Sequence, residues 1–292
     1  NMSAATADAP AQRATGAPAL PLALVPASLF VLLVGGLISV PLPWSVSWPW
    51  IPALDVHFAL YVDGLSAQFL LLITGIGTLV AVYGAGYLAG DARRWRVFAL
   101  LLLFMLAMIG AVCSDHLLVL FVFWELTSVL SFLLVGFDHA RESSRKSAQQ
   151  ALLITGAGGL FLLAGIILLA GIGGSYSLRE LIAAAPSMAD DARLPAALTL
   201  LFVGAFSKSA QFPFHFWLPN AMAAPTPVSA FLHSATLVKL GIYLLARLDA
   251  AFSDLLFWEY SLVGIGTLTA VLAAVQTVRE RDLKRILAWS TV

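Results

Sequence analysis

Four ionisable residues lie inside apolar stretches of this 292-residue sequence: Glu125, Lys208, His233 and Lys239. A charged side chain at the centre of a membrane helix costs about 2.5–3.5 kcal/mol on insertion scales. A glutamate and two lysines would together cost on the order of 8–10 kcal/mol if unpaired, which is comparable with the stability of a whole domain. We therefore expect these groups to pair, to neutralise or to line water.

Side chains of these types can carry protons. A desolvated lysine releases its proton readily, and a nearby carboxylate restores the charged form. Histidine titrates near neutral pH and can pass a proton in either direction. The pattern favours a proton relay through Glu125, Lys208 and His233. Two alternatives stay open: a Glu125–Lys208 pair that only holds two helices together, and a core His233 hydrogen-bonded to Ser229 or Ser234.

The sequence after Lys208 cannot continue as one helix, because prolines interrupt helices. The prolines of this stretch are Pro213, Pro219, Pro225 and Pro227. Irregular backbone at membrane depth is tolerated only inside protein or beside a cavity, and in transporters such breaks mark the ion path. The alternative is an ordinary loop at the membrane surface. For His215 two interpretations stay open: it accepts protons where they enter the proton path, or it is only an interfacial histidine.

Other polar residues receive more modest interpretations. Lys239 follows His233 by six residues, about 240° around an ideal helix, so we expect it on another face, in a second water path. Asp63 is expected to cap the helix that follows it. Asp115 and His116 are expected in a solvated turn.

The composition indicates which elements position these residues. The chain is 60% hydrophobic and 11% charged, with 16 basic and 16 acidic side chains. Soluble domains carry about 25% charged residues, so the sequence predicts an all-α, polytopic membrane protein. Zero net charge without a basic stripe argues against nucleic-acid binding. A single cysteine, Cys113, inside an apolar run excludes a disulfide scaffold.

Apolar runs of about 20 residues, the length that crosses a bilayer, predict eight transmembrane helices and the start of a ninth near Asp282. The predicted spans are Leu20–Val40, Leu65–Leu88, Val97–Cys113, Leu117–Phe137, Ser147–Ile172, Pro195–Phe212, Thr226–Ala246 and Leu256–Val275. The run from Gly156 to Gly159 predicts a close helix contact rather than a phosphate site, since no strand precedes it.

Cations in the connections predict the orientation. Eleven Lys and Arg residues lie on the side of the leading tail, and the opposite side carries Arg179, Arg193 and Arg247. The positive-inside rule therefore predicts a multi-pass protein of the cell membrane with its tail in the cytoplasm. Residues 1–19, rich in Ala and Pro, are predicted to be a disordered tail, with a cleaved signal peptide as the alternative. Tryptophans among prolines predict an interfacial aromatic belt at Trp44, Trp48 and Trp50.

Three stretches resemble a known family: Ser114–Phe137, Gly204–Arg247 and Asp282–Thr291. They are similar to the antiporter-like subunits of the complex I and Mrp superfamily. The form Trp-Glu-Leu-Thr-Ser at residues 124–128 resembles the A-type subunits of the Mrp-type multisubunit Na⁺/H⁺ antiporters. The resemblance implies that Glu125 pairs with Lys208. It also implies that a histidine at position 233 continues the relay.

The resemblance implies a secondary transporter subunit rather than an enzyme. Its partners would be other Mrp-type membrane subunits in a hetero-oligomeric complex, the lipid bilayer, and the exchanged protons and Na⁺ or another monovalent cation, with no cofactor. His215 and Lys239 match Mrp positions that are commonly uncharged in the respiratory subunit. The alternatives are a proton-pumping membrane subunit of an NADH:quinone oxidoreductase, a related hydrogenase or inorganic-carbon uptake complex, and a purely structural role.

The same resemblance implies a domain organisation. Residues 20–96 would be leading transmembrane helices with an interfacial segment, and residues 97–246 the first five-helix proton-translocating repeat. Residues 247–292 would begin a second, truncated repeat, so we expect a fragment or a truncated gene product whose N-terminus is one helix short. Asn220 stands where the family usually has Asp, and Ala223 and Ala224 stand where Mrp subunits often have Glu.

Overall fold

A computed structural model describes residues 20–52 and 56–292, so the predicted disordered tail, residues 1–19, lies outside the described residues. The helices are α1 (Leu20–Ser39), α2 (Gly64–Tyr87), α3 (Arg94–Cys113), α4 (Leu117–Val135), α5 (Glu142–Gly173), α6 (Leu178–Met188), α7 (Leu194–Lys208), α8 (Trp217–Asn220), α9 (Thr226–Ser229), α10 (Lys239–Phe252), α11 (Leu256–Arg279) and α12 (Leu283–Thr291). Two strands, β1 (Trp44–Ile51) and β2 (Val56–Val62), a short 3₁₀ turn, η2 (Ala221–Ala223), and a π-helical segment, η3 (Ala230–Thr236), complete the described chain.

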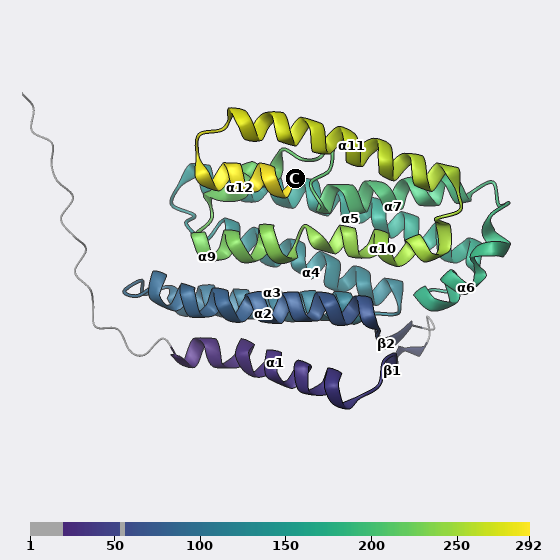
Figure 1. Cartoon of the computed structure of the whole chain (residues 1–292), viewed down its shortest axis with the longest axis horizontal. Helices are drawn as coiled ribbons and strands as arrows, with labels where there is room; N and C mark the ends of the chain where they lie inside the picture. Colours follow the sequence, from purple (N-terminus) through teal and green to yellow (C-terminus); the bar gives the residue numbers. More distant parts are fainter. Residues whose placement is uncertain (1–19, 53–55) are drawn as a thin grey trace, which may run out of the picture.

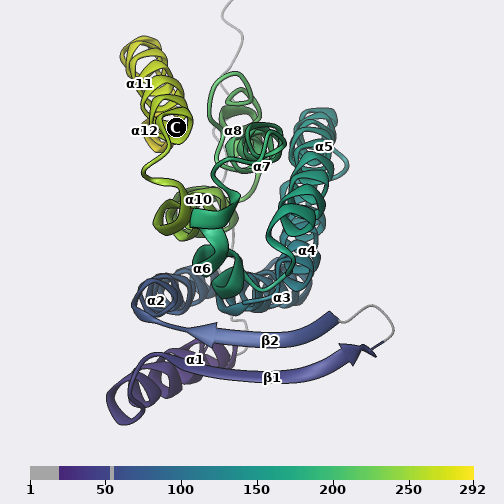
Figure 2. The same cartoon turned by 90° about the vertical axis from the view of Figure 1, so that its right-hand side faces the viewer.

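The long helices run side by side, with the hairpin and α6 at one end of the bundle (Figure 1). Seen along the helices, α2, α3, α4 and α5 form a curved wall (Figure 2). Helices α7, α8 and α10 pack on the inner side of that wall, while α1 lies outside α2. Helix α11 stands at the edge of the bundle, and most of its side chains are exposed. The interior between the wall and α7 is where the buried ionisable residues meet.

Five helices of the described chain are long and apolar enough to cross a membrane: α2, α3, α4, α5 and α11. The segment Ala23–Ser39 of α1 and the whole of α7 are apolar but shorter. The predicted span Thr226–Ala246 is not one helix, because α9, η3 and α10 divide it. The mainly helical, apolar architecture is confirmed, but the predicted count of eight spans and the start of a ninth is not.

The prediction of an all-α chain is wrong between residues 44 and 62, where β1 and β2 pair as an antiparallel hairpin. Trp48 and Trp50 of β1 contact the ring of Phe58 at centroid distances of 6.5 and 6.4 Å. Phe58 in turn meets Phe123 of α4 at 6.2 Å. These ring contacts fix the hairpin across the helix ends and leave β1 as an exposed outer strand.

The two ends of the bundle differ in charge. The cation-rich connections gather at the end opposite the hairpin, where Arg93 and Arg141 both pair with Asp138, at 3.8 and 2.8 Å. Arg247, predicted as a cation of the other set of connections, lies instead inside α10 and is buried. Helix α6, between two predicted spans, was not predicted.

Glycines let α5 approach its neighbours closely. A Cβ on Gly158 would lie 1.7 Å from the hydroxyl oxygen of Ser207 on α7. A Cβ on Gly159 would lie 1.9 Å from Oε1 of Glu125 on α4. Gly156, by contrast, faces open space. The predicted close helix contact is therefore confirmed at Gly158 and Gly159.

Candidate functional site

Lys208, the last residue of α7, is at the centre of the buried polar groups. Its side chain is fully buried, with 0% exposure. Its Nζ donates hydrogen bonds to the backbone oxygen of Trp124 at 2.9 Å and to the hydroxyl of Ser128 at 2.7 Å, both on α4. It also lies 5.3 Å from the centroid of the Trp124 indole ring. The ammonium is thus held by neutral oxygens and an aromatic face.

Glu125 lies beside this lysine on α4 and is half-buried. The two charges interact electrostatically, but no salt bridge joins them within the described residues. The Oε1 atom of Glu125 is buried without a hydrogen-bond partner and lies against Gly159 of α5. The carboxylate and the ammonium are therefore neighbours that do not bond directly to each other in the described structure.

His233 lies in η3, and its side chain is buried. Neither ring nitrogen has a hydrogen-bond partner in the described structure. The hydroxyl of Ser229 donates instead to the backbone oxygen of Ala224 at 3.3 Å. His233 is therefore a core residue, but the expected hydrogen bond to Ser229 is not formed, and the side chain of Ser234 lies outside the described residues.

Trp217, which sequence reasoning missed, connects the lysine region to the histidine. Its indole Nε1 donates to the backbone oxygen of Ser207, the residue before Lys208, at 3.0 Å. Its ring meets that of His233 edge-on, with centroids 5.9 Å apart. The tryptophan lies within the broken stretch, two residues before Pro219, and its position in the sequence gave no signal of this bridging role.

The helical conformation of α7 ends at Lys208. Ala210 adopts a left-handed backbone conformation with φ of 52°, and the hydroxyl of Ser209 donates to the backbone oxygen of Val238 at 2.7 Å. Ser209 and Ala210 are buried, whereas Phe216 is exposed. The predicted break is confirmed, and it begins inside the protein before its middle part reaches the surface.

His215 lies in the partly exposed part of this break. Its ring contacts those of Phe212, Phe216 and Trp289, the last at a centroid distance of 5.7 Å. Its Nδ1 is buried and has no hydrogen-bond partner in the described chain. Within the described residues, no hydrogen bond or ring contact joins His215 to Lys208 or His233.

Lys239, the first residue of α10, is exposed on the outside of the chain. The structure thus brings Glu125, Lys208 and His233 into one interior and leaves Lys239 outside it. The expected buried position of Lys239 is wrong, and its participation in a second water path stays a prediction.

Helix α12 covers the broken stretch from the side. The Nζ of Lys284 donates to the backbone oxygen of Ala224 at 3.2 Å, just before α9 begins. Ala288 of α12 is fully buried, and Trp289 contacts His215. The amide of Asn220 donates to the side-chain oxygen of Gln150 on α5 at 2.8 Å. The break is therefore fixed by contacts from both α5 and α12.

A second polar group lies at the hairpin end. The guanidinium of Arg247 forms a salt bridge with Asp63 and a hydrogen bond to the hydroxyl of Tyr243 at 2.9 Å. Asp63 also accepts from the backbone N–H of Ser66 at 3.0 Å, so its predicted capping of α2 is confirmed. Burial raises the pKa of Asp63, but hydrogen bonds from Arg247 and Ser66 outweigh this effect and hold it below the usual value.

The expectation of a solvated turn at Asp115 and His116 is wrong. Asp115 is only 3% exposed, and it accepts a hydrogen bond from the hydroxyl of Ser177 at 2.9 Å. It also forms a salt bridge with Arg179 at 3.2 Å. His116 is buried beside it and stacks on Tyr176 at a centroid distance of 5.7 Å. This group holds α4 against the start of α6.

No group of three or more metal-ligating side chains occurs in the part of the chain that the structure describes. The described interior brings together the carboxyl group of Glu125, the amine of Lys208 and the imidazole of His233.

Comparison with protein families gives a clear match. The family described as "NADH:quinone oxidoreductase/Mrp antiporter, TM" matches residues 114–292, and "NADH-Ubiquinone oxidoreductase (complex I), chain 5 N-terminus" matches residues 48–98. The chain belongs to the NADH:quinone oxidoreductase/Mrp antiporter transmembrane family. It is accordingly a multi-pass membrane protein.

Relatives within this family are named as Na⁺/H⁺ antiporter subunits. The chain is 50% identical over 245 residues to the one designated A in Alkalihalophilus pseudofirmus, covering 84% of this chain and 30% of that protein. It is 49% identical over 243 residues to the one designated A1 in Staphylococcus haemolyticus, covering 83% of this chain and 30% of the relative. The chain therefore spans about 30% of the length of these curated relatives.

Two solved structures share the fold. A chain of the Mrp complex from Dietzia sp. DQ12-45-1b matches with a TM-score of 0.86 and 40% identity, covering 94% of this chain and 30% of that one. A chain of the membrane-bound sulfane sulfur reductase, an archaeal respiratory membrane complex, matches with a TM-score of 0.82 and 24% identity over 94% of this chain and 57% of that one. The second likeness shows the fold alone.

Proposed function

We propose that this chain is part of a subunit of an Mrp-type monovalent cation/proton antiporter, and that Glu125, Lys208 and His233 carry protons through it. The observation that carries the proposal is the environment of Lys208, whose buried ammonium is hydrogen-bonded to neutral oxygens with the Glu125 carboxylate nearby. Desolvation favours the neutral amine and the carboxylate favours the cation. A small displacement of the carboxylate would therefore switch the lysine between holding and releasing its proton.

The unpartnered polar atoms support a continuous path. Oε1 of Glu125 and both ring nitrogens of His233 are buried without protein partners in the described chain. Buried polar groups of this kind are normally satisfied by water, and a chain of such waters conducts protons. Trp217, which contacts the His233 ring and the backbone next to Lys208, would border this path.

The relatives support transport rather than enzymatic catalysis. Proteins named as Na⁺/H⁺ antiporter subunits are about half identical to this chain, whereas the respiratory reductase shares only its fold. These similarities do not favour the alternative of a proton-pumping subunit of an NADH:quinone oxidoreductase. Exchange of Na⁺, assembly with other Mrp-type membrane subunits and a cytoplasmic tail side belong to the same proposal.

His215 and Lys239 take outer positions in this proposal. His215 would exchange protons where the broken stretch reaches the surface, next to Trp289. Lys239 points outward, so it would act only in a path that another part of the assembly completes.

The test uses everted membrane vesicles that contain the complete antiporter complex, from a host without its own sodium/proton antiporters. After the interior is acidified, addition of Na⁺ should raise the internal pH, reported by a pH-sensitive dye. Glu125→Gln and Lys208→Ala should abolish this response while the complex remains assembled. Wild-type alkalinisation by both variants would refute the relay. Acidification that requires an electron donor and this chain, without a Na⁺ response, would identify a redox-driven pump instead.

A further inference from the structure

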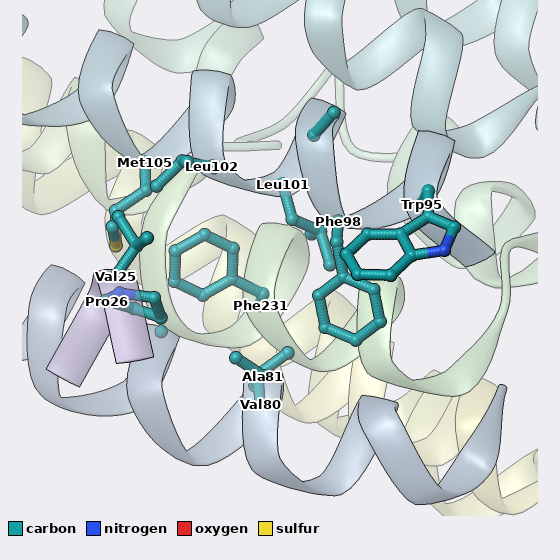
Figure 3. Close-up of a pocket in the computed structure, with 12 residues that line it drawn as sticks. Val25, Pro26, Val80, Ala81, Trp95, Phe98, Leu101, Leu102, Met105 and Phe231 are labelled. Carbon is teal, nitrogen blue, oxygen red and sulfur yellow. The ribbon is translucent and has the colours of Figure 1, made fainter. Parts of the chain in front are cut away.

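An apolar cavity of about 260 Å³ lies between α1, α2 and α3 and ends at Phe231 of η3 (Figure 3). Pro26, Ala81, Leu101 and Met105 contribute to its walls. Its volume equals that of about nine water molecules, but water needs polar partners that such walls do not offer. The cavity therefore suits a hydrocarbon occupant.

The cavity reaches the outer surface of the bundle. Val25 of α1 and Trp95 of α3 line it and are 47% and 56% exposed. Because α2 and α3 are long and apolar enough to cross a membrane, lipid chains would lie against the surface around this opening. A hydrocarbon chain can therefore come from the bilayer, directly from the side.

A second recess, of about 270 Å³, adjoins this opening at the cation-rich end. It shares Trp95 with the cavity and is also lined by Arg94 and Asp91. The guanidinium of Arg94 lies 5.6 Å from the centroid of the Trp95 ring and forms no salt bridge within the described residues. Asp91 is already hydrogen-bonded to Arg93, at 3.3 Å. The charge left uncompensated at this recess is thus positive.

We propose that the two recesses form one binding site for an anionic glycerophospholipid, with an acyl chain beside Phe231 and the phosphate at Arg94. Apolar walls, a lateral opening, and an uncompensated cation at the end of an apolar helix are the three features that such a lipid requires. The acyl chain leaves one hydrocarbon environment for another, so the hydrophobic effect discriminates little between lipids. Discrimination comes from the head group, and one arginine near the surface contributes about fivefold.

The occupant would touch the segment that carries His233. Phe231 lies two residues before that histidine, its ring meets Phe104 at 5.8 Å, and its backbone oxygen accepts from the hydroxyl of Thr236 at 2.6 Å. An acyl chain on Phe231 would therefore support the π-helical turn from its outer side. The binding site itself does not depend on the proposed transport function.

The experiment uses the complete assembled complex in nanodiscs of phosphatidylcholine that contain a trace of phosphatidylglycerol with a diazirine in the middle of one acyl chain. After illumination, adducts are mapped by peptide mass spectrometry. We expect adducts on the peptides that contain Met105 and Phe231. Unlabelled phosphatidylglycerol should suppress them about fivefold more effectively than added phosphatidylcholine.

Two variants separate the parts of the site. Ala81→Phe fills the cavity and should reduce these adducts at least tenfold. Leu79→Phe is the control on the same helix, because the Leu79 side chain is 69% exposed, and it should leave the adducts unchanged. Arg94→Gln, which leaves the core intact, should remove the preference for phosphatidylglycerol but keep the labelling, and Arg141→Gln at the same end should change neither. Equal competition by both lipids in the unmodified protein, or labelling that Ala81→Phe leaves unchanged in an assembled complex, would overturn the proposal.

Discussion

Replacing Gly159 by alanine tests whether the position of the Glu125 carboxylate matters. The added Cβ would lie 1.9 Å from Oε1 and 2.8 Å from Cδ of Glu125, where ordinary contacts begin at 3.4 Å. The carboxylate must therefore move by about 1.5 Å, because the backbone of the α4–α5 contact gives way less easily than the end of a flexible side chain.

The size of the effect follows from this displacement. For charges roughly 5 Å apart in an effective dielectric of about 20, a change of about 1.5 Å alters their interaction by about 1 kcal/mol. That energy changes a proton-transfer equilibrium by about fivefold, whichever way the carboxylate moves. We therefore expect Gly159→Ala to slow Na⁺-induced alkalinisation in everted vesicles by about fivefold or more.

Gly156 provides the matched control, because it lies one turn earlier on α5 and a Cβ there meets nothing within 4 Å. Gly156→Ala has the same gain in helix propensity, about 1 kcal/mol, without touching Glu125. It should transport at the rate of the unmodified protein. An assembled Gly159→Ala complex with an unchanged rate would refute the reasoning. Failure of that variant alone to assemble, judged by native gel electrophoresis, would assign the glycine to packing instead.

Three further predictions use single substitutions. Lys208→Arg should abolish transport, since a guanidinium does not release its proton, and a fully active variant would exclude a deprotonating lysine. Asp63→Asn should lower the stability of the complex by about 1–3 kcal/mol, measured as a lower Tm, because it leaves the buried Arg247 without its counter-charge. Since the folded-state pKa of Asp63 lies below its ordinary value of 3.8, this contribution is complete above that pH. It is lost as the pH falls from 3.8 through the folded-state pKa, and the Asn variant should lack this loss. Asp191→Asn should leave Tm unchanged although Arg193 lowers the pKa of Asp191 to about 2, because this ion pair lies at the surface, with Arg193 57% exposed and Asp191 26% exposed.

The membrane helices were the most predictable part of the fold. Helices α2 to α5 lie within a few residues of the predicted spans, because a helix is the one local structure that satisfies its own backbone inside a bilayer. The grouping of Glu125, Lys208 and His233 was predictable for a related reason. Exposure of a charged group to lipid is costly, which favours a shared interior for these three residues, although Lys239 does not follow this rule.

The hairpin and the polar group at its end were less predictable. Tryptophan and proline at residues 44–50 are typical of a membrane interface, and this composition concealed the alternation of a strand. Asp115 was expected in solvent because its neighbours in sequence suggest a turn. Its actual partners, Ser177 and Arg179, lie more than 60 residues away in the sequence, so local reasoning could not find them.

Lys239 lies on another face than His233, as the spacing predicted, but it faces out of the chain, and the turn before it is not α-helical. The backbone N–H of Leu237 donates to the backbone oxygen of Leu232, five residues earlier. The hydroxyl of Thr236 likewise donates to the backbone oxygen of Phe231, five residues earlier. The turn between His233 and Lys239 is therefore wider than an α-helical one, so the angle between the two side chains differs from that of an ideal helix. The outcome is an exposed Lys239 at the start of α10, although it lies in an apolar stretch of the sequence.

The hydrogen bond from Lys284 to Ala224 also has a consequence for biogenesis. The donor lies 60 residues after its acceptor, so a ribosome synthesising about 5–20 residues per second makes the lysine roughly 3–12 s later. During that interval the broken stretch enters the membrane without α12 beside it. Insertion factors would have to shield the broken stretch from lipid for seconds, far longer than a helix needs to form. Stalling translation between these two residues should therefore trap a nascent chain that membrane quality control can recognise.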